Sequence, residues 1–360
     1  MIRCWFDALT PKQARIAAIL YKELEKYSIY LFITTREYPY VREVLDSSGV
    51  PYIVVGKYGG DLKSKLRCYA ERILQLLDTI GEFSVAIGFP SPEMHRVAFG
   101  LGKPIITLTD TPQAYHVSKL TLPLSTYVIV PAVFPEDALR RYIPAAEISK
   151  VIKFNGLFEV MWIRRYLKEI VNEGSKLLKE LELESEEFAI FRPEESRAAY
   201  YRYGSSIEIS LNIVRRLVSE GLKVLVFPRY EDQFGVFENY LKDYVKNGKV
   251  LLVRGRPLDL VFLYPYARVV ITGGLTMATE AALIGTPALT YFPEELGICQ
   301  FLRQFGLPIV HVYDMAKVCD VVSELLRSRK LTIDQVSEVL EKIEDPTYVI
   351  VDKVLELAGR

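Results

Sequence analysis

Hydrophobic and polar positions alternate along the chain with two periods, which indicates strands and helices in regular succession. Short apolar runs rich in Val and Ile are typical of strands that are covered on both faces of a parallel sheet. Longer stretches with apolar residues three or four positions apart are typical of amphipathic helices. The alternation of the two predicts an α/β protein with mainly parallel sheets.

The predicted elements group into two doubly wound halves. Six strands are expected in the first half, at residues 2–6, 29–34, 52–55, 85–88, 104–109 and 127–130. A second half opens at residues 188–192 and continues through strands at 224–227, 250–253, 269–272, 288–292 and 309–311. Ligands bind such domains at the carboxyl ends of the strands, so we expect two Rossmann-like domains that face each other across a cleft.

The expected domain limits follow from breaks in the pattern. Asn155-Gly156 interrupts it between the halves, and a charge-laced helical stretch covers residues 160–187. We therefore expect an N-terminal domain over residues 1–155 and a C-terminal domain over residues 156–344. The last helix, over residues 345–360, follows Asp345-Pro346 and is expected to pack back on the N-terminal domain.

Composition and charge narrow the range of possible functions. Among 360 residues, 45 Lys and Arg balance 45 Asp and Glu, so no bulk field favours nucleic acid or an acidic membrane. Four widely spaced cysteines without a C-x-x-C pair argue against a zinc site and a secreted disulfide framework, which favours a cytoplasmic protein. No secretory leader or transmembrane run is recognised. Because G-x-G-x-x-G, Walker A and isolated D-x-D patterns are missing, we expect neither cofactor nor metal.

A Gly-Gly turn after a buried strand is the most informative segment. The strand over residues 269–272 runs into Gly273-Gly274, where glycine permits a positive φ and a close approach to a ligand. The helix that follows begins with N–H groups that favour an anion such as a diphosphate. Glu280, farther along this helix, can accept the hydroxyls of a ribose. The alternatives are a merely tight connection and a Glu that only complements the helix dipole.

This segment carries a family resemblance. Residues 256–280 and the Gly-x-Pro at Gly285 resemble the second domain of the GT-B superfamily, notably UDP-N-acetylglucosamine 2-epimerases. Residues 273–280 also resemble the nucleotide loop of the N-acetylglucosaminyltransferase that makes the lipid-linked peptidoglycan precursor. The resemblance implies that Gly274, Thr276 and Met277 contact base or phosphate through their backbones and that Glu280 contacts the ribose.

A second resemblance covers most of the chain. Asp7-Ala-Leu-Thr-Pro11 and Asp110-Thr-Pro112 are similar to segments of a largely archaeal family of unknown function related to these epimerases. The epimerases have a His-Arg pair where this chain reads Phe191-Arg192, and the peptidoglycan-type transferases have a Gly-rich first loop with a His that is replaced here. The epimerase likeness implies a homodimer, while the sequence itself leaves the oligomeric state open.

Candidate catalytic groups follow the strands of the first half. Asp110 ends a strand and is the preferred acceptor of a proton, with Asp7 and His116 as further candidates. A helix cap or Asx-turn is the alternative for Asp110, a cap for Asp7, and an exposed loop residue for His116. Lys12, at the next helix start, could hold an anion.

Two arginines follow strands of the second half. Arg192 and Arg229 are each placed to neutralise a diphosphate by bidentate pairing. Surface ion pairs with Glu194, Glu195 or Glu231 are the alternative for them.

Together these features predict a GT-B-type, glycosyltransferase-like enzyme that takes a nucleotide sugar, a UDP-hexosamine, and transfers the sugar to a glycan or lipid-linked acceptor. The first domain would supply the acceptor site and catalytic groups, and the second would bind the donor. An epimerase-like or hydrolysing activity is the alternative, as is a non-catalytic nucleotide-sugar-binding protein.

Overall fold

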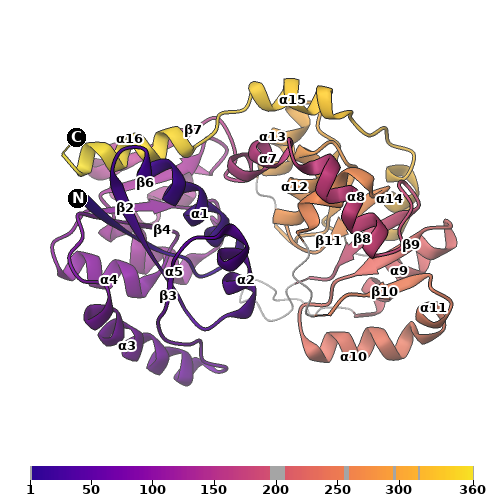
Figure 1. Cartoon of the computed structure of the whole chain (residues 1–360), viewed down its shortest axis with the longest axis horizontal. Helices are drawn as coiled ribbons and strands as arrows, with labels where there is room; N and C mark the ends of the chain where they lie inside the picture. Colours follow the sequence, from indigo (N-terminus) through magenta and orange to yellow (C-terminus); the bar gives the residue numbers. More distant parts are fainter. Residues whose placement is uncertain (1, 195–206, 255–258, 295–296, 315–316, 360) are drawn as a thin grey trace. The chain divides into compact units, whose positions relative to one another are not determined.

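The computed structural model describes residues 2–194, 207–254, 259–294, 297–314 and 317–359, which form two compact units (Figure 1). Unit 1 comprises Met1–Trp162 and Ile343–Arg360, and unit 2 comprises Ile163–Lys342. The start of the Gly-Gly resemblance, residues 256–258, and the candidate ion-pair partner Glu195 lie outside the described residues. No described helix is both long and apolar enough to cross a membrane.

Unit 1 is built on a seven-stranded parallel sheet with the order β3-β2-β1-β4-β5-β6-β7. Its strands are β1 (Ile2–Asp7), β2 (Ile29–Thr35), β3 (Ile53–Val54), β4 (Val85–Gly88), β5 (Ile105–Leu108), β6 (Tyr127–Pro131) and β7 (Val151–Phe154). The strand order reverses at β1. The chain passes from β1 outward through β2 to β3, and it then returns to the other side of β1 to form β4. In such sheets the crevice at the reversal is the ordinary ligand position.

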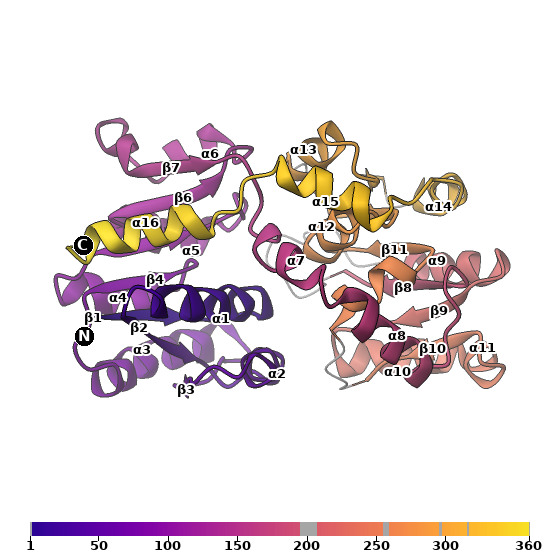
Figure 2. The same cartoon turned by 45° about the horizontal axis from the view of Figure 1, so that its top comes forward.

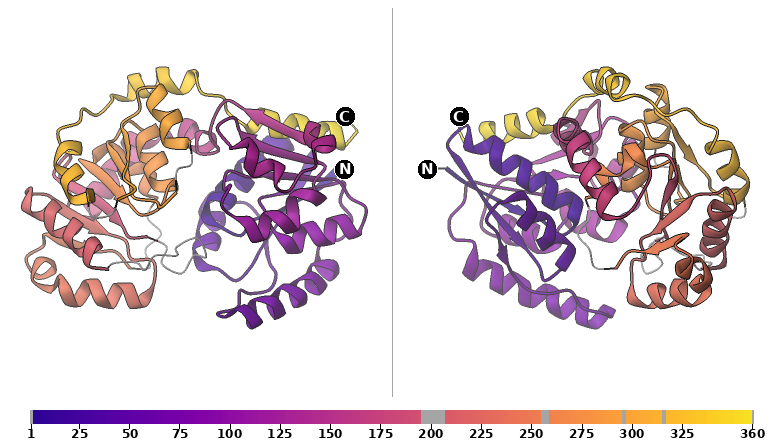
Figure 3. Two further views of the ribbon diagram at one scale, coloured as in Figure 1. Left: turned by 180° about the vertical axis from the view of Figure 1, so that it is seen from behind. Right: turned by 45° about the vertical axis from the view of Figure 1, so that its right-hand side comes forward.

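Right-handed crossovers place the helices of unit 1 on both faces of the sheet. The helices are α1 (Pro11–Glu25), α2 (Pro39–Ser48), α3 (Leu62–Thr79), α4 (Pro92–Gly100), α5 (Tyr115–Thr121), α6 (Glu136–Arg140) and α16 (Thr347–Leu357), with 3-10 turns η1 (Leu122–Leu124) and η2 (Ala145–Lys150). Helices α1 and α2 contact each other, and α3, α4 and α5 form a second contiguous row. Figure 3 shows unit 1 from behind and in an oblique view.

Two features of unit 1 differ from the sequence-based expectation. Strand β7 was not predicted, because its sequence Val-Ile-Lys-Phe is short and includes the exposed Lys153 of an edge strand. The helical stretch expected over residues 160–187 is two helices, α7 (Val160–Tyr166) and α8 (Ile170–Glu180), and the boundary between the units falls within α7.

The end of the chain belongs to unit 1. The backbone N–H of Glu344 donates to Asn155 O at 2.9 Å, and the N–H of Asn155 donates to the Glu344 carboxylate at 2.6 Å. Gly156 makes this contact possible, because a Cβ there would lie 2.0 Å from Glu344 O. Helix α16 then runs beside α1 (Figure 2). Its Glu356 accepts a hydrogen bond from Tyr127 of β6.

Unit 2 repeats the plan with a six-stranded parallel sheet of order β10-β9-β8-β11-β12-β13. Its strands are β8 (Phe188–Arg192), β9 (Lys223–Val226), β10 (Val250–Leu252), β11 (Val269–Thr272), β12 (Ala288–Thr290) and β13 (Ile309–His311). The remaining elements are α9 (Ile207–Ser219), α10 (Glu231–Tyr240), α11 (Lys242–Lys246), η3 (Leu260–Phe262), η4 (Tyr264–Tyr266), α12 (Thr276–Leu283), α13 (Ile298–Gln304), α14 (Val318–Leu325) and α15 (Ile333–Glu341). In this sheet the strand order reverses between β8 and β11.

Buried strands supply the cores of both units, as the apolar runs predict. Every residue of β4, β5 and β11 is buried. In unit 2, alternate residues such as Phe191 and Ile271 pack against α9 and against Phe237 of α10. Rigid, fully covered strands fix where their carboxyl ends emerge, so the residues that follow them are held in defined positions.

Candidate functional site

Three charged side chains meet at the carboxyl edge of the unit 1 sheet: Lys12, Asp110 and Glu159. Lys12 lies in the first turn of α1, which begins at Pro11 and is capped by the Thr10 hydroxyl. Its ammonium donates to Glu159 Oε1 at 2.5 Å and to the Asp110 carboxylate. All three are largely enclosed, with 15%, 12% and 5% of the Lys12, Asp110 and Glu159 side chains exposed.

The electrostatics of this trio favour proton exchange at Glu159. Burial would lower the pKa of Lys12, but the two carboxylates raise it above its ordinary value, so the lysine stays charged. Burial raises the pKa of Glu159, and the Asp110 charge adds to that effect while Lys12 opposes it. Because Glu159 is buried and shares one cation with Asp110, it takes up a proton more readily than an exposed glutamate.

Asp110 follows β5 as expected, and it is not a helix cap. Ala114 precedes the first residue of α5, and the Thr111 hydroxyl donates to Asp110 Oδ1 at 3.1 Å. The other carboxylate oxygen bonds Lys12. The structure therefore joins Asp110 to a buried charge cluster, and neither alternative interpretation describes its contacts.

Asp7 occupies a different environment: its side chain is completely buried. Arg72 of α3 donates to both of its oxygens, at 2.6 and 3.0 Å, and the hydroxyls of Thr34 and Ser91 each donate at 2.7 Å. Burial would raise the pKa of Asp7, but Arg72 and the hydroxyl donors lower it. The alternative interpretation, a helix cap, is wrong, since Thr10 caps α1, and these contacts favour a structural role for Asp7 over the predicted catalytic one.

The histidine candidate lies on a helix and not in a loop. His116 is exposed in the first turn of α5, with its ring against Tyr115 at 5.4 Å between centroids. A second histidine, His95, is fully buried between Ser91 O and the Thr107 hydroxyl, each at 2.7 Å. Burial lowers its pKa to about 4, so it remains neutral and structural.

In unit 2 the Gly-Gly turn joins β11 to α12, but neither glycine has the positive φ that the sequence suggested. Close packing is the reason for Gly273, because a Cβ there would lie 2.5 Å from the Cα of Glu194. A Cβ on Gly274 would lie 2.9 Å from a terminal nitrogen of Arg229. The turn is thus compressed between the chain after β8 and an arginine from the loop after β9.

Both candidate arginines flank this turn. Arg229 is positioned by its Nε, which donates to Pro193 O at 2.9 Å, and Arg192 lies with a terminal nitrogen 3.8 Å from the sulfur of Met277. The start of α12, which contains Thr276 and Met277, has no side-chain cap. Two guanidinium groups and an uncapped helix start form a cationic surface suited to a diphosphate.

The glutamates proposed as surface partners of these arginines have other contacts. Glu194 is buried and accepts hydrogen bonds from the Tyr291 hydroxyl at 3.0 Å and the Ser210 hydroxyl at 3.3 Å. Glu231 pairs with Arg254. The described contacts of Glu194 and Glu231 are thus with other residues.

Glu280 lies inside α12 and is 6% exposed. Its Oε2 accepts a hydrogen bond from the Tyr264 hydroxyl at 3.1 Å. That bond orients the carboxylate within the first two turns of the helix, on the same element as Thr276 and Met277. A carboxylate held in this way can accept hydroxyls of a bound sugar.

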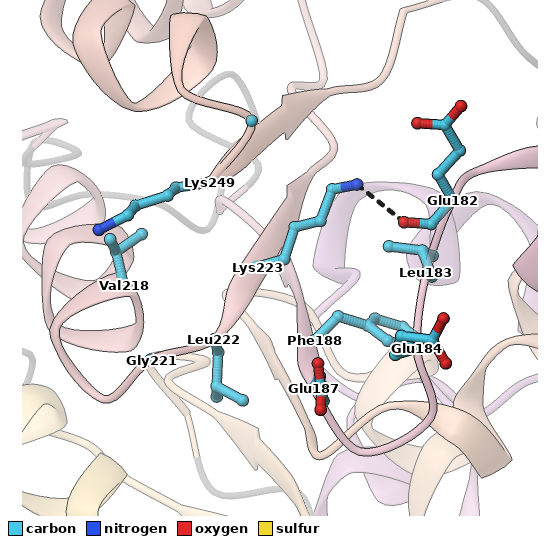
Figure 4. Close-up of a pocket in the computed structure, with 11 residues that line it drawn as sticks. Glu182, Leu183, Glu184, Glu187, Phe188, Val218, Gly221, Leu222, Lys223 and Lys249 are labelled. Atoms are coloured by element: carbon cyan, nitrogen blue, oxygen red, sulfur yellow. Dashed lines mark hydrogen bonds between the residues drawn. The ribbon is translucent and has the colours of Figure 1, made fainter.

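A separate pocket of about 250 Å³ lies at the opposite edge of the same sheet (Figure 4). Phe188 and Lys223, the first residues of β8 and β9, line it, and Lys223 donates to Glu182 O at 3.0 Å. Since ligands of parallel α/β sheets bind at carboxyl ends, this pocket is not the candidate site. In the ranges that the structure describes, no group of three or more His, Cys, Asp or Glu side chains is placed to hold a metal.

Comparison with protein families identifies the group to which the sequence is related. Residues 2–359 match the family described as "protein of unknown function (DUF354)". The chain belongs to this family. A relative, the uncharacterized protein MJ0665 of Methanocaldococcus jannaschii, is 28% identical over 355 residues, which are 97% of each chain.

Solved structures share the fold at low identity. The UDP-GlcNAc 2-epimerase of M. jannaschii, solved with UDP-GlcNAc and UDP, superposes with a TM-score of 0.71 and 14% identity, covering 94% of this chain and 99% of its own. A glycosyltransferase of Rickettsia africae gives a TM-score of 0.57 and 11% identity over 99% and 98% of the two chains. These findings confirm the fold class, two Rossmann-like units with neighbours of the GT-B type, and the resemblance to epimerases and transferases.

Sequence reasoning did not identify Glu159 as a site residue or Lys12 as its partner. Glu159 follows β7, the strand that the pattern did not reveal, so its position at the carboxyl edge was hidden. The signal available in the sequence was a lysine directly after the proline that begins a helix. Two acidic residues elsewhere in this half of the chain each follow a strand.

Replacing Arg72 with Met should cost about 3–5 kcal/mol, because a buried carboxylate then loses its cation. Both tryptophans of the chain, Trp5 and Trp162, belong to unit 1, so tryptophan fluorescence in urea reports the unfolding of this unit. Folding lowers the pKa of Asp7, so the ion pair stabilises the folded protein above the pKa of an unfolded aspartate, about 3.9. This stabilisation is lost as the pH falls through the lowered pKa of Asp7.

The exposed pair of Arg42 with Glu37 provides the control for this prediction. An equal loss of stability in Arg42→Met would contradict the assignment.

Proposed function

We propose that this protein is a GT-B-type enzyme that binds a UDP-hexosamine through unit 2 and transfers the hexosamine to an acceptor with the help of unit 1. The observation that carries the proposal is the surface around the Gly-Gly turn, where Arg229 lies beside Gly274 and Arg192 lies beside Met277 in the first turn of α12. Each component suits the donor: cations and N–H groups for the diphosphate, and the oriented carboxylate of Glu280 for the ribose hydroxyls.

The proton chemistry is assigned to the trio of Lys12, Asp110 and Glu159. Transfer to a hydroxyl needs a base near the acceptor and positive charge near the departing diphosphate. Asp110 can take the acceptor proton, with Lys12 holding its carboxylate in place. Glu159, with its raised pKa, can hold that proton afterwards.

Epimerisation at carbon 2 of the hexosamine is the second candidate, and one feature favours it. Two carboxylates on a single lysine supply both an acid and a base, which an elimination and readdition at the sugar would require. The M. jannaschii neighbour bound to UDP-GlcNAc is an epimerase with this fold. Against this candidate, the chain has Phe191 in place of the epimerase His, and Phe191 is fully buried in the unit 2 core.

Replacing Glu280 with Ala should weaken UDP-GlcNAc binding by about 1–3 kcal/mol, because the sugar hydroxyls lose a charged acceptor. Isothermal titration calorimetry with the full chain measures this change. Glu184→Ala is the matched control, since Glu184 lines the pocket at the opposite sheet edge. Unchanged affinity in Glu280→Ala would show that this carboxylate does not hold the ribose.

Incubation with UDP-GlcNAc in D₂O separates the two candidates. Epimerisation replaces the hydrogen at carbon 2 with deuterium and yields a second isomer, both visible by NMR. Transfer leaves the unreacted donor unlabelled and releases UDP when an acceptor is present. Deuterium at carbon 2 would therefore reject the transferase in favour of the epimerase.

In whichever reaction is observed, Asp110→Asn and Glu159→Gln should each slow turnover by about 10²–10⁴-fold while donor affinity stays near the wild-type value. We expect turnover to fall while donor affinity is kept, because Asp110 and Glu159 lie in unit 1 and the proposed donor contacts lie in unit 2. Glu136→Gln, which changes an exposed carboxylate of unit 1, is the control. Full turnover in both variants would remove the trio from the mechanism.

A further inference from the structure

Two cations gather on one tyrosine ring at the carboxyl edge of the unit 1 sheet. Arg36 directly follows β2, Tyr58 lies in the loop between β3 and α3, and Lys65 is in the first turn of α3. The guanidinium carbon of Arg36 is 4.2 Å from the centre of the Tyr58 ring, and the Lys65 ammonium is 5.0 Å from it. Both cations are therefore held near the π system of this one ring.

Neither cation has an anionic partner within the described ranges. No side-chain hydrogen bond or ion pair of Arg36 or Lys65 occurs there, and the Nε of Arg36 is buried without an acceptor. Burial lowers the pKa of Arg36, which reflects the cost of enclosing this charge. A buried donor without a partner is uncommon, because it forfeits a hydrogen bond that water would provide.

The carboxylates nearby are engaged elsewhere. Asp7 is saturated by Arg72 and hydroxyls, and Glu37 pairs with Arg42. Glu93 acts on Arg36 at longer range and lies 3.8 Å from Arg72, which shares its charge. Among the described residues, neither Arg36 nor Lys65 therefore has a carboxylate in direct contact, and Glu93 offsets the Arg36 charge only at longer range.

The loop that carries Tyr58 is fixed before any ligand binds. The N–H of Glu37 donates to Gly56 O at 2.9 Å, which joins the loop to the end of β2. Gly59 packs on the start of α3, since a Cβ there would lie 2.3 Å from Lys65 N. Asp61 caps α3 by accepting from the N–H groups of Lys63 and Ser64. A site built from such fixed parts loses little entropy on binding.

We propose that Arg36, Tyr58 and Lys65 form a recognition site for a phosphate group of the second substrate, the acceptor. The guanidinium can bind two phosphate oxygens side by side, and the ammonium adds a point charge, so a dianion matches the two cations. This inference rests on the proposed function, in which unit 1 receives the acceptor.

The sheet order also constrains the shape of that acceptor. Strand β2 is separated from β5 by β1 and β4, so Arg36 and Asp110 follow strands that lie three spacings, roughly 14 Å, apart. An acceptor that reaches both residues therefore extends along the edge of the sheet, with its phosphate at one end and its reacting hydroxyl at the other.

Calorimetric titration of the full chain with pyrophosphate tests the site. Arg36→Gln and Lys65→Gln should each weaken pyrophosphate binding by about tenfold or more, the loss expected for a charge-assisted contact. Arg42→Gln, which removes an exposed cation on the adjacent helix α2, should leave it unchanged. Wild-type affinity in both Arg36→Gln and Lys65→Gln would overturn the proposal, as would an equal loss in Arg42→Gln.

Further measurements test whether the site prefers phosphate and whether it is distinct from the donor site. Malonate, a dicarboxylate, should bind more weakly than pyrophosphate, and an equal affinity would overturn the assignment to phosphate. Any pyrophosphate bound in unit 2 should be lost in Arg229→Gln and retained in Arg36→Gln, so failure of the donor site and failure of this site are distinguishable. Tryptophan fluorescence verifies that the unit 1 variants fold. If Arg36→Gln does not fold, Lys65→Gln, which changes a residue on the surface of α3, tests the site.

Discussion

The buried ion pair between Asp7 and Arg72 is the interaction on which the carboxyl edge of unit 1 depends. Asp7 ends β1, and its carboxylate also receives the hydroxyls of Thr34 in β2 and Ser91 before α4. Arg72 comes from α3 and donates through its Nε to Val55 O after β3 at 2.8 Å. The ion pair thus ties three strands and two helices together, at a place where an unpaired charge would be very costly.

This constraint positions chemistry on both sides of β1. To one side, Lys12 extends from the loop and helix that follow Asp7 and draws Asp110 and Glu159 into one cluster. To the other side, Arg36 follows the strand whose Thr34 is bonded to Asp7, and its buried Nε has no acceptor among the described residues. A rigid central pair with reactive or unsatisfied charges around it is the arrangement expected of a preorganised site.

The fold was predictable from the sequence, because buried parallel strands leave a strong local signal. Val269–Thr272 and Phe188–Arg192 are observed as strands over the predicted residues. The edge strand β7 was not predictable, since a half-exposed four-residue strand owes its formation to pairing with β6. Contacts across the sheet were equally hidden: nothing local links Lys12 with Glu159, or Arg36 with Tyr58. The Gly-Gly turn was located correctly, but the positive φ expected there is absent, and the packing requirement at Gly273 comes from Glu194, far away in the sequence.

Hydrogen–deuterium exchange of the full chain, with and without UDP-GlcNAc, is the most direct test of the central claim that unit 2 binds a nucleotide sugar at its carboxyl edge. The account predicts slower exchange in the Gly-Gly turn and the first turns of α12, over residues 273–280, because their N–H groups contact the ligand. Unchanged exchange in this segment at saturating UDP-GlcNAc, or protection confined to the opposite sheet edge around Lys223, would contradict it.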